Sequence, residues 1–180
     1  MDNYFIITGA PGSGKTAILS ALAQQGFSIV LETAREILEE QRAIEGDGVY
    51  DRNPALFKEL LLSRAISYYK AHQYDNNLVF FDRGIPDIIA YADCFDLPRG
   101  AEIKASEKFR YNNKVFFAPS WKAIYTNDEE RRISFIDAKQ FGDNLKQIYE
   151  SLGYELIEIP CVSPGERAAF ILSNVDTNEK

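Results

Sequence analysis

The 180-residue sequence is poor in the residues on which several common chemistries depend. It contains two cysteines and one histidine, which excludes a disulfide framework and a catalytic system built on paired histidines. Cys94 and Cys161 are far apart and lack metal-ligand spacing, so we expect free, buried thiols in a reducing compartment. His72, near the end of a long helical pattern, is expected at the surface without a chemical role.

Positive charge and long apolar runs are also scarce. Lysine and arginine number 20 against 27 acidic residues, and the net charge of −7 argues against a broad basic face for nucleic acid or anionic lipid. No apolar run approaches the length of a membrane span, and no signal-peptide pattern precedes the first expected strand. We therefore expect a cytoplasmic protein without nucleic-acid or membrane partners, with one domain over residues 1–175 and a frayed tail at 176–180.

A complete phosphate-binding P-loop is present at residues 9–16. An apolar, β-branched segment at 4–8 precedes it, and a segment with helical spacing follows at 17–23, which is the order that a P-loop requires. Its glycines allow backbone N–H groups to converge on phosphate oxygens, and the helix N-terminus adds a positive dipole. The nucleotide-binding residues predicted here are Gly9, Ala10, Pro11, Gly12, Ser13, Gly14, Lys15, Thr16 and Ala17. The Thr16 hydroxyl is predicted to bind Mg²⁺, with ATP as the donor.

The rest of the chain alternates between expected strands and helices. Apolar segments predict strands at 4–8, 27–31, 78–81, 115–118 and 154–159, and helical spacing predicts helices at 33–43, 55–72, 85–95, 128–151 and 165–173. Within the helix at 55–72, the expected inner face carries Leu56, Leu60, Leu61 and Ile66. This alternation is typical of an α/β fold in which helices cover both faces of a parallel sheet. Ligands of such sheets bind beyond the carboxyl ends of the strands.

Acidic residues and arginines follow two of those strands. Asp82 ends an apolar run in the manner of a Walker B strand, where its carboxylate would hold Mg²⁺ or accept the proton of an attacking hydroxyl, unless it only caps the next turn. Arg83 would grip a phosphate or substrate, or else pair with a carboxylate such as Glu32. Glu32 would orient or deprotonate a hydroxyl, or else the segment 32–36 is a solvated acidic helix start.

A charged run at 128–132 follows the fourth expected strand. Charge runs are usually solvated surfaces. Small P-loop kinases nevertheless carry a lid at this point, and lid arginines neutralise the transferring phosphoryl group. We assign that role to at least one of Arg131 and Arg132. The predicted catalytic residues are therefore Lys15, Asp82, Glu32, Arg131 and Arg132.

With these motifs, the sequence resembles small P-loop proteins grouped as AAA-domain ATPases or kinases, and is similar to nicotinamide riboside kinase domains. The resemblance rests on the P-loop, residues 32–36, 80–87 and 128–132, and Glu166-Arg167. It implies a nucleoside-kinase-like, five-stranded parallel sheet in the order 2-3-1-4-5. It also implies acceptor contacts from Glu32, Arg35, Asp82 and Asp87, and a nucleotide base beside Val162. Gly46–Arg52 departs from the kinase relatives, and acceptor specificity is expected there.

Two functional hypotheses follow. The first is a Mg-ATP-dependent kinase of a small nucleoside-like metabolite, and the second is a regulatory ATPase that acts as a nucleotide-dependent switch. The acids and arginines on the acceptor side favour the kinase. The sequence leaves open the acceptor, the choice between ATP and GTP, the oligomeric state, and which of Asp82 and Glu32 is the general base.

Overall fold

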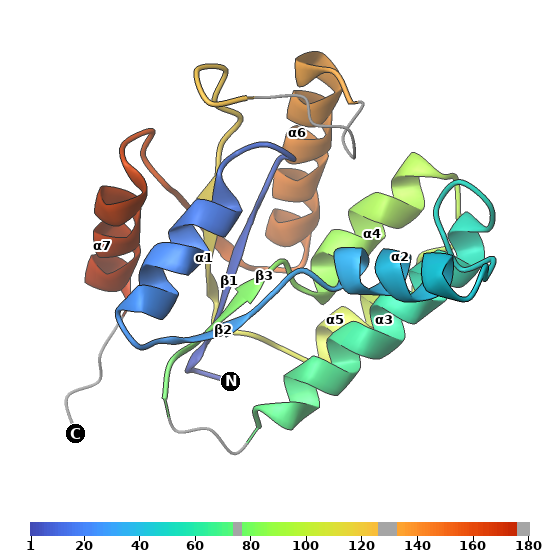
Figure 1. The fold of residues 1–180 in the computed structure, drawn as a ribbon. Coiled ribbons are helices and arrows are strands. Elements are labelled where there is room, and N and C mark those ends of the chain that lie inside the picture. The colour runs from blue at the N-terminus through green and yellow to red at the C-terminus, as the bar shows by residue number, and fades with distance from the viewer. Residues whose placement is uncertain (74–76, 126–132, 176–180) are drawn as a thin grey trace.

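The computed structural model describes residues 1–73, 77–125 and 133–175, which form a sheet of parallel strands with helices on both faces (Figure 1). The five strands are β1 (Tyr4–Gly9), β2 (Ser28–Val30), β3 (Val79–Asp82), β4 (Lys114–Ala118) and β5 (Glu155–Glu158). They lie in the order β2-β3-β1-β4-β5, and every neighbouring pair is parallel. The predicted fold class and strand order are therefore confirmed.

The helices follow the strands along the chain as α1 (Lys15–Gln24), α2 (Thr33–Ala43), α3 (Pro54–Ala71), α4 (Ile85–Cys94), α5 (Gly100–Lys108), α6 (Phe135–Ser151) and α7 (Pro164–Asn174). Within the described ranges, none of them is both long and apolar enough to cross a bilayer. In Figure 1, α1 and α7 lie on one side of the sheet and α4 and α6 on the other.

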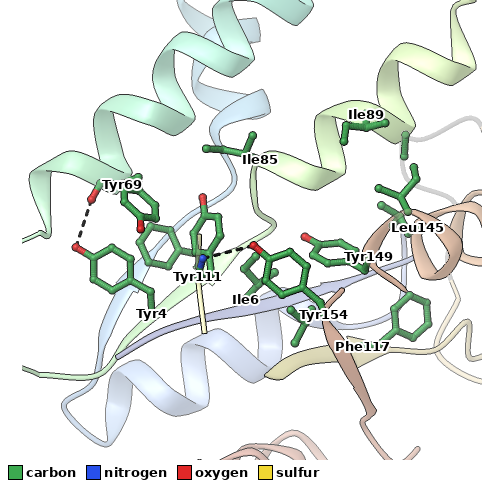
Figure 2. Packing of buried hydrophobic residues seen from close by; sticks show 14 of the residues in the cluster. Tyr4, Ile6, Tyr69, Ile85, Ile89, Tyr111, Phe117, Leu145, Tyr149 and Tyr154 are labelled. Atoms are coloured by element: carbon green, nitrogen blue, oxygen red, sulfur yellow. Dashed lines mark hydrogen bonds between the residues drawn. The ribbon is translucent and has the colours of Figure 1, made fainter. Parts of the chain in front are cut away.

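Alternation along β1 explains why both faces are covered. Phe5 and Ile7 pack with residues of α1 and α7, whereas Tyr4 and Ile6 pack with residues of α4 and α6. All four side chains are buried, so the central strand is apolar throughout, as a parallel sheet buried on both faces requires. The second face is rich in tyrosine: Figure 2 shows Tyr4, Tyr69, Tyr111, Tyr149 and Tyr154 together.

Most of the helix expected over 128–151 is present as α6, which begins at Phe135, where the Ser134 side chain caps it by accepting from the Asp137 N–H at 3.1 Å; residues 128–132 lie outside the described residues. Two other details of the sequence prediction are wrong. On α3, Leu56 is exposed, because Phe57 and Leu61 instead pack against Ile37 of α2 and Ile88 of α4.

The second error concerns the two cysteines. Cys94 and Cys161 are free, as expected, but both are exposed rather than buried. Cys94 is the last residue of α4, and Cys161 lies in the loop between β5 and α7. Ends of elements and connecting loops lie at the surface, and this placement overrides the general preference of cysteine for the interior.

Candidate active site

The P-loop joins β1 to α1 and needs glycine at three positions. Gly9, Gly12 and Gly14 have φ values of 138°, 74° and 81°, which other residues rarely adopt. A Cβ on Gly9 would also lie 2.1 Å from the carbonyl oxygen of Ala118 in β4, so the close approach of the two strands excludes a side chain there. Gly14 is the N-cap of α1, and its left-handed conformation turns the chain from the loop into the helix. The predicted strand–loop–helix unit is therefore present.

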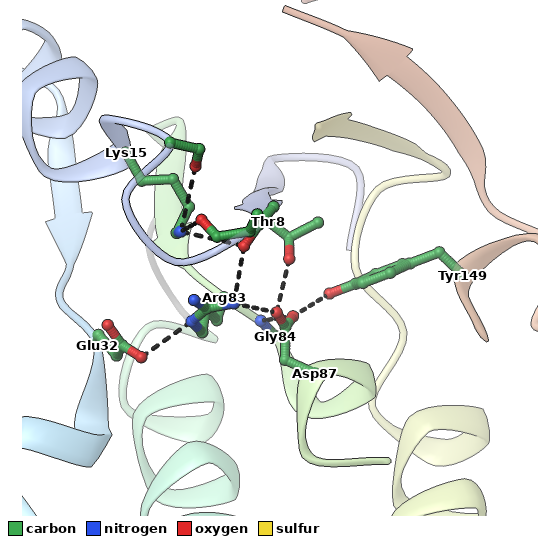
Figure 3. A network of polar contacts seen from close by, with 10 residues as sticks. Thr8, Lys15, Glu32, Arg83, Gly84, Asp87 and Tyr149 are labelled. Atoms are coloured by element: carbon green, nitrogen blue, oxygen red, sulfur yellow. Dashed lines mark hydrogen bonds and ion pairs between the residues drawn. The ribbon is translucent and has the colours of Figure 1, made fainter. Parts of the chain in front are cut away.

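Lys15 curls back over the loop from the first position of α1. Its Nζ donates to the carbonyl oxygens of Gly9 at 3.1 Å and Ala10 at 3.0 Å, and lies 3.5 Å from Ser13 Oγ (Figure 3). Burial, with a further contribution from the positive charge of Arg83, lowers the pKa of Lys15 to about 7. The ammonium group is thus held at the loop in a site that an anionic phosphate would stabilise.

Asp82 lies at the carboxyl end of β3, directly beside β1. Its register partner in β1 is Ile7, so the carboxylate is placed near the start of the P-loop. The Oδ1 atom is buried and has no hydrogen-bond partner within the described part of the chain. Burial raises the pKa of Asp82 to about 6, and the charge of Lys15 opposes this rise. A buried carboxylate oxygen without a partner is costly, and such groups are concentrated at functional sites.

Arg83 connects the ends of several elements through one side chain. Its Nε donates to Glu32 Oε1 at 2.9 Å, and its Nη1 donates to Asp87 Oδ1 at 3.0 Å and to the Gly9 carbonyl oxygen at 3.1 Å (Figure 3). Its backbone is left-handed, with φ of 69°, a conformation that non-glycine residues rarely hold away from functional or tightly constrained positions. Burial acts to lower the pKa of Arg83, but Glu32, Asp87 and Asp82 together raise it. Arg83 therefore pairs with Glu32, which is one of the two alternatives that the sequence left open.

Asp87 is hydrogen-bonded through both carboxylate oxygens. Oδ1 accepts from Thr8 Oγ1 at 2.6 Å as well as from Arg83, and Oδ2 accepts from the Gly84 N–H at 2.9 Å and the Tyr149 hydroxyl at 2.5 Å. The sequence offered no signal for the contributions of Thr8 and Tyr149. Burial, and then the charge of Asp87, raise the pKa of Tyr149 well above its usual value, so Tyr149 remains a donor.

A cavity of about 230 Å³ lies beside this network. Five polar residues line it, namely Glu32, Thr33, Asp82, Arg83 and Asp87. Most of the remaining wall is apolar, and its aromatic members are Phe57, Tyr68, Phe81, Tyr91, Tyr111 and Phe141. A cavity with mostly apolar, aromatic walls and a small number of polar groups is typical of a small-molecule site.

The other predicted site residues lie around this centre. Arg35 is exposed and lines a second hollow of about 290 Å³, which shares Glu32, Phe57 and Tyr91 with the first. Val162 is half-buried in the loop between β5 and α7, where its N–H donates to the Pro160 carbonyl oxygen at 3.1 Å. Arg131 and Arg132 lie outside the described residues, so their lid role stays a prediction.

One arginine beside the P-loop has no counterpart among the predicted site residues. Arg167 Nη1 donates to the Ser13 carbonyl oxygen at 3.0 Å, although 154 residues separate the two in sequence. The Glu166-Arg167 pair was noted only as part of the family resemblance. A lone arginine in a helix gives no sign in the sequence that it reaches the loop.

The family of the chain is established by comparison with known proteins. Residues 4–167 match a family described as an AAA domain, so the chain belongs to this family and the predicted resemblance is confirmed. No curated protein sequence is similar enough to count as a match.

Solved structures of small-molecule kinases share the fold. Deoxyadenosine kinase from M. mycoides with bound dATP is 13% identical with a TM-score of 0.67, over 94% of this chain and 97% of that chain. NadR protein in complex with NR is 16% identical with a TM-score of 0.68, over 96% of this chain but only 51% of that chain. Shikimate kinase from Acinetobacter baumannii with bound shikimate is 15% identical with a TM-score of 0.54, over 98% of this chain and 94% of that chain. At these identities the comparisons show a P-loop kinase fold and leave the substrate open.

Proposed function

We propose that this chain is an ATP-dependent kinase that phosphorylates a hydroxyl group of a small, ring-bearing, nucleoside-like metabolite. The observation that carries the proposal is the buried Oδ1 of Asp82, which has no hydrogen-bond partner among the described residues and lies in the wall of a cavity beside the P-loop. A P-loop alone fits any nucleotide-binding protein. A carboxylate with a raised pKa in the wall of an adjacent cavity fits a proton acceptor for a second substrate.

The P-loop and Lys15 bind the donor in this proposal. Backbone N–H groups of residues 12–16 surround the β- and γ-phosphates, and the α1 N-terminus contributes its dipole. Lys15 exchanges its hydrogen bonds to the Gly9 and Ala10 carbonyl oxygens for phosphate oxygens. The phosphate charge then restores the ordinary protonation of its amine.

Asp82 accepts the proton of the acceptor. The acceptor oxygen attacks the γ-phosphorus, the bond from that phosphorus to the β–γ bridging oxygen breaks, and ADP leaves with that oxygen. The hydroxyl proton passes to Asp82 Oδ1 and then to solvent. Glu32 is the weaker candidate for this step, because Arg83 holds its Oε1 at 2.9 Å and stabilises its charged form. Its proposed part is to orient the acceptor hydroxyl.

A magnesium ion fits the residues present. The Thr16 hydroxyl would hold it directly and Asp82 would hold it through a water molecule, so that Asp82 Oδ1 stays available to accept the proton. Mg²⁺ in kinases is bound by one or two protein oxygens together with phosphates and water. When bound, the ion neutralises charge on the phosphate oxygens.

The shape and lining of the cavity support the class of acceptor. At about 230 Å³ it lies below the range typical of drug-sized ligands, and its aromatic walls suit a flat ring. Deoxyadenosine kinase and NadR in complex with NR, which share the fold, support a nucleoside-like compound. Shikimate kinase in complex with shikimate has the same fold and a different kind of ligand, so the aromatic lining is the observation that favours the nucleoside-like class.

A binding screen tests the proposal. Nucleosides, ring-bearing vitamins and shikimate-like carbocycles would each be added to the protein with a non-hydrolysable ATP analogue and Mg²⁺, and thermal stabilisation measured. We expect one nucleoside-like class to raise the melting temperature beyond the analogue alone. A protein stabilised by the analogue and by no hydroxyl compound, but whose binding to a partner protein differs between ATP and ADP, would be the regulatory switch instead.

A further inference from the structure

Arg167 is a buried arginine in the first turn of α7 that contacts the P-loop. Its exposed fraction is 2%, and Nη1 donates to the Ser13 carbonyl oxygen at 3.0 Å. Helix α7 packs beside α1, the helix that follows the P-loop (Figure 1). The guanidinium group therefore holds the middle of the loop through the Ser13 carbonyl group and not through the N–H groups that would bind phosphate.

The loop sequence accommodates this contact. A Cβ on Gly14 would lie 2.9 Å from Arg167 Nη1 and 3.0 Å from Ile124 Cδ1. Any other residue at position 14 would push the guanidinium group or Ile124 away, in addition to the strain of the left-handed backbone. The close packing of Arg167 against the loop is therefore a second constraint, besides the left-handed backbone, that requires glycine at position 14.

The charge of Arg167 has no partner among the described residues. Its Nε and Nη2 are buried without a hydrogen-bond acceptor, and none of the described carboxylates forms an ion pair with it. The half-buried Arg83 differs, since it pairs with Glu32 and Asp87. Burial lowers the pKa of Arg167, with Cys161 a smaller, opposing influence. An uncompensated buried cation is unfavourable for folding, and a bound anion relieves that cost.

We propose that Arg167 is a positioning residue for the donor nucleotide: it fixes the Ser13 peptide, and its unneutralised charge is retained because the phosphate chain of the bound nucleotide compensates it across the loop. The inference rests on the proposed binding of Mg-ATP and adds a residue to that site. This role of Arg167 predicts an effect of substitution that a purely structural arginine would not show. Removing the charge weakens phosphate binding while leaving the ligand-free protein as stable as before or more stable.

The test measures binding and stability side by side in the full chain. Arg167→Met keeps most of the side-chain volume and removes the charge, and Arg167→Lys keeps the charge without the planar fork. The matched control is Arg99→Met, because Arg99 is half-exposed and pairs with Asp93 far along the chain from the loop. Calorimetry would give the dissociation constants for Mg-ATP, Mg-tripolyphosphate and adenosine, and thermal unfolding would follow the ligand-free proteins.

We expect Arg167→Met to bind Mg-ATP and Mg-tripolyphosphate about tenfold more weakly, as for loss of a charge-assisted interaction. Its ligand-free melting temperature should be no lower than that of the wild type. Arg167→Lys should lose less affinity than Arg167→Met, and Arg99→Met should bind as the wild type does. Affinity for adenosine should not change.

Three results would overturn the inference. The first is a ligand-free Arg167→Met protein that is clearly less stable or does not fold, because the arginine would then be structural. The second is an affinity loss confined to Mg-ATP and absent for Mg-tripolyphosphate, because the contact would then be with the nucleoside. The third is unchanged affinity in a wild-type-like background. If the wild type itself does not bind Mg-ATP, the proposed function fails as well.

Discussion

Lys15 and Asp82 are two buried, ionisable residues whose protonation responds in opposite ways to the same surroundings. Burial lowers the pKa of the amine to about 7 and raises that of the carboxyl to about 6. Both groups therefore change charge near neutral pH in the ligand-free protein. The proposed reaction should therefore depend on pH, because binding of the donor phosphates needs a charged Lys15 and proton transfer from the acceptor needs a charged Asp82.

Lys15→Ala should abolish phosphoryl transfer and weaken triphosphate binding without unfolding the protein. The side chain contacts loop carbonyl oxygens and contributes no apolar packing that the fold depends on. Nucleotide titrations and thermal unfolding, with the exposed Lys139→Ala as control, would check this. Wild-type turnover and ATP affinity in the variant would show that the loop is not used as described.

The affinity of the wild type for Mg-ATP should fall as pH rises above about 7. The free enzyme has a lowered Lys15 pKa, so above that value the amine must first take up a proton to bind phosphate. Between pH 7 and 9 the dissociation constant should rise by about tenfold or more. Calorimetry in buffers of different ionisation enthalpy would measure the proton uptake. A pH-independent affinity with no uptake would contradict the lowered pKa.

Asp82→Asn should leave nucleotide affinity within a few-fold but lower turnover about a hundredfold or more, as expected for loss of a general base. In the wild type, kcat/KM should fall below pH 6, because the protonated carboxyl no longer accepts a proton. The variant should lack that acidic limb. Equal activity of the two proteins would remove Asp82 from catalysis and favour Glu32 as the base.

At the scale of elements, Asp87 joins α4 to β1, β3 and α6 through Thr8, Arg83 and Tyr149. Both carboxylate oxygens of Asp87 already accept two hydrogen bonds each. This favours a positioning role for Asp87 over the predicted direct contact with the acceptor. The carboxylate keeps Arg83, and through it Glu32, at the mouth of the cavity.

Asp87→Ala should therefore destabilise the protein by about 3–5 kcal/mol, because it leaves a half-buried arginine and three other donors without their acceptor. Chemical denaturation would measure the change. Asp93→Ala on the same helix is the control, since its half-exposed ion pair with Arg99 should be worth about 1 kcal/mol or less. A small effect at Asp87 would mean that the network does not hold these elements together.

Much of this arrangement could be predicted from local patterns. The P-loop and the strand ending at Asp82 are each encoded by consecutive residues, and the structure has both of them. The partners of Asp87 and Arg167 lie 79 and 154 residues away in the chain, at Thr8 and Ser13, and depend on strand register and helix packing. Leu56 was misplaced for a similar reason: the first turns of α3 are apolar on several sides, and only packing selects the buried one.

For the whole molecule, the position of the aromatic cavity supports the proposed function. It lies between β2, β3 and helices α2, α3 and α4, and Asp82 and Arg83 form its boundary with the P-loop side. Phosphate and acceptor would therefore meet at the carboxyl edge of the sheet, where parallel α/β folds bind ligands.

Filling the cavity should block the acceptor and spare the donor. Ala34 lines the cavity from α2, so Ala34→Phe should raise the acceptor KM by about tenfold or more while the affinity for Mg-ATP changes less than about twofold. Ala43→Phe, at the exposed end of the same helix, is the matched control. An unchanged acceptor KM in the first variant would place the acceptor elsewhere.

Isotope tracing would show directly whether the protein transfers the γ-phosphoryl group of ATP to a hydroxyl compound. ATP labelled with ¹⁸O in its γ-phosphoryl group would be incubated with Mg²⁺, the protein and a pool of nucleosides and related metabolites, followed by mass spectrometry. We expect a labelled phosphomonoester of a ring-bearing hydroxyl compound, and we expect its yield to be strongly reduced with the Asp82→Asn variant. Label found only in inorganic phosphate, at a rate that no compound in the pool changes, would contradict it.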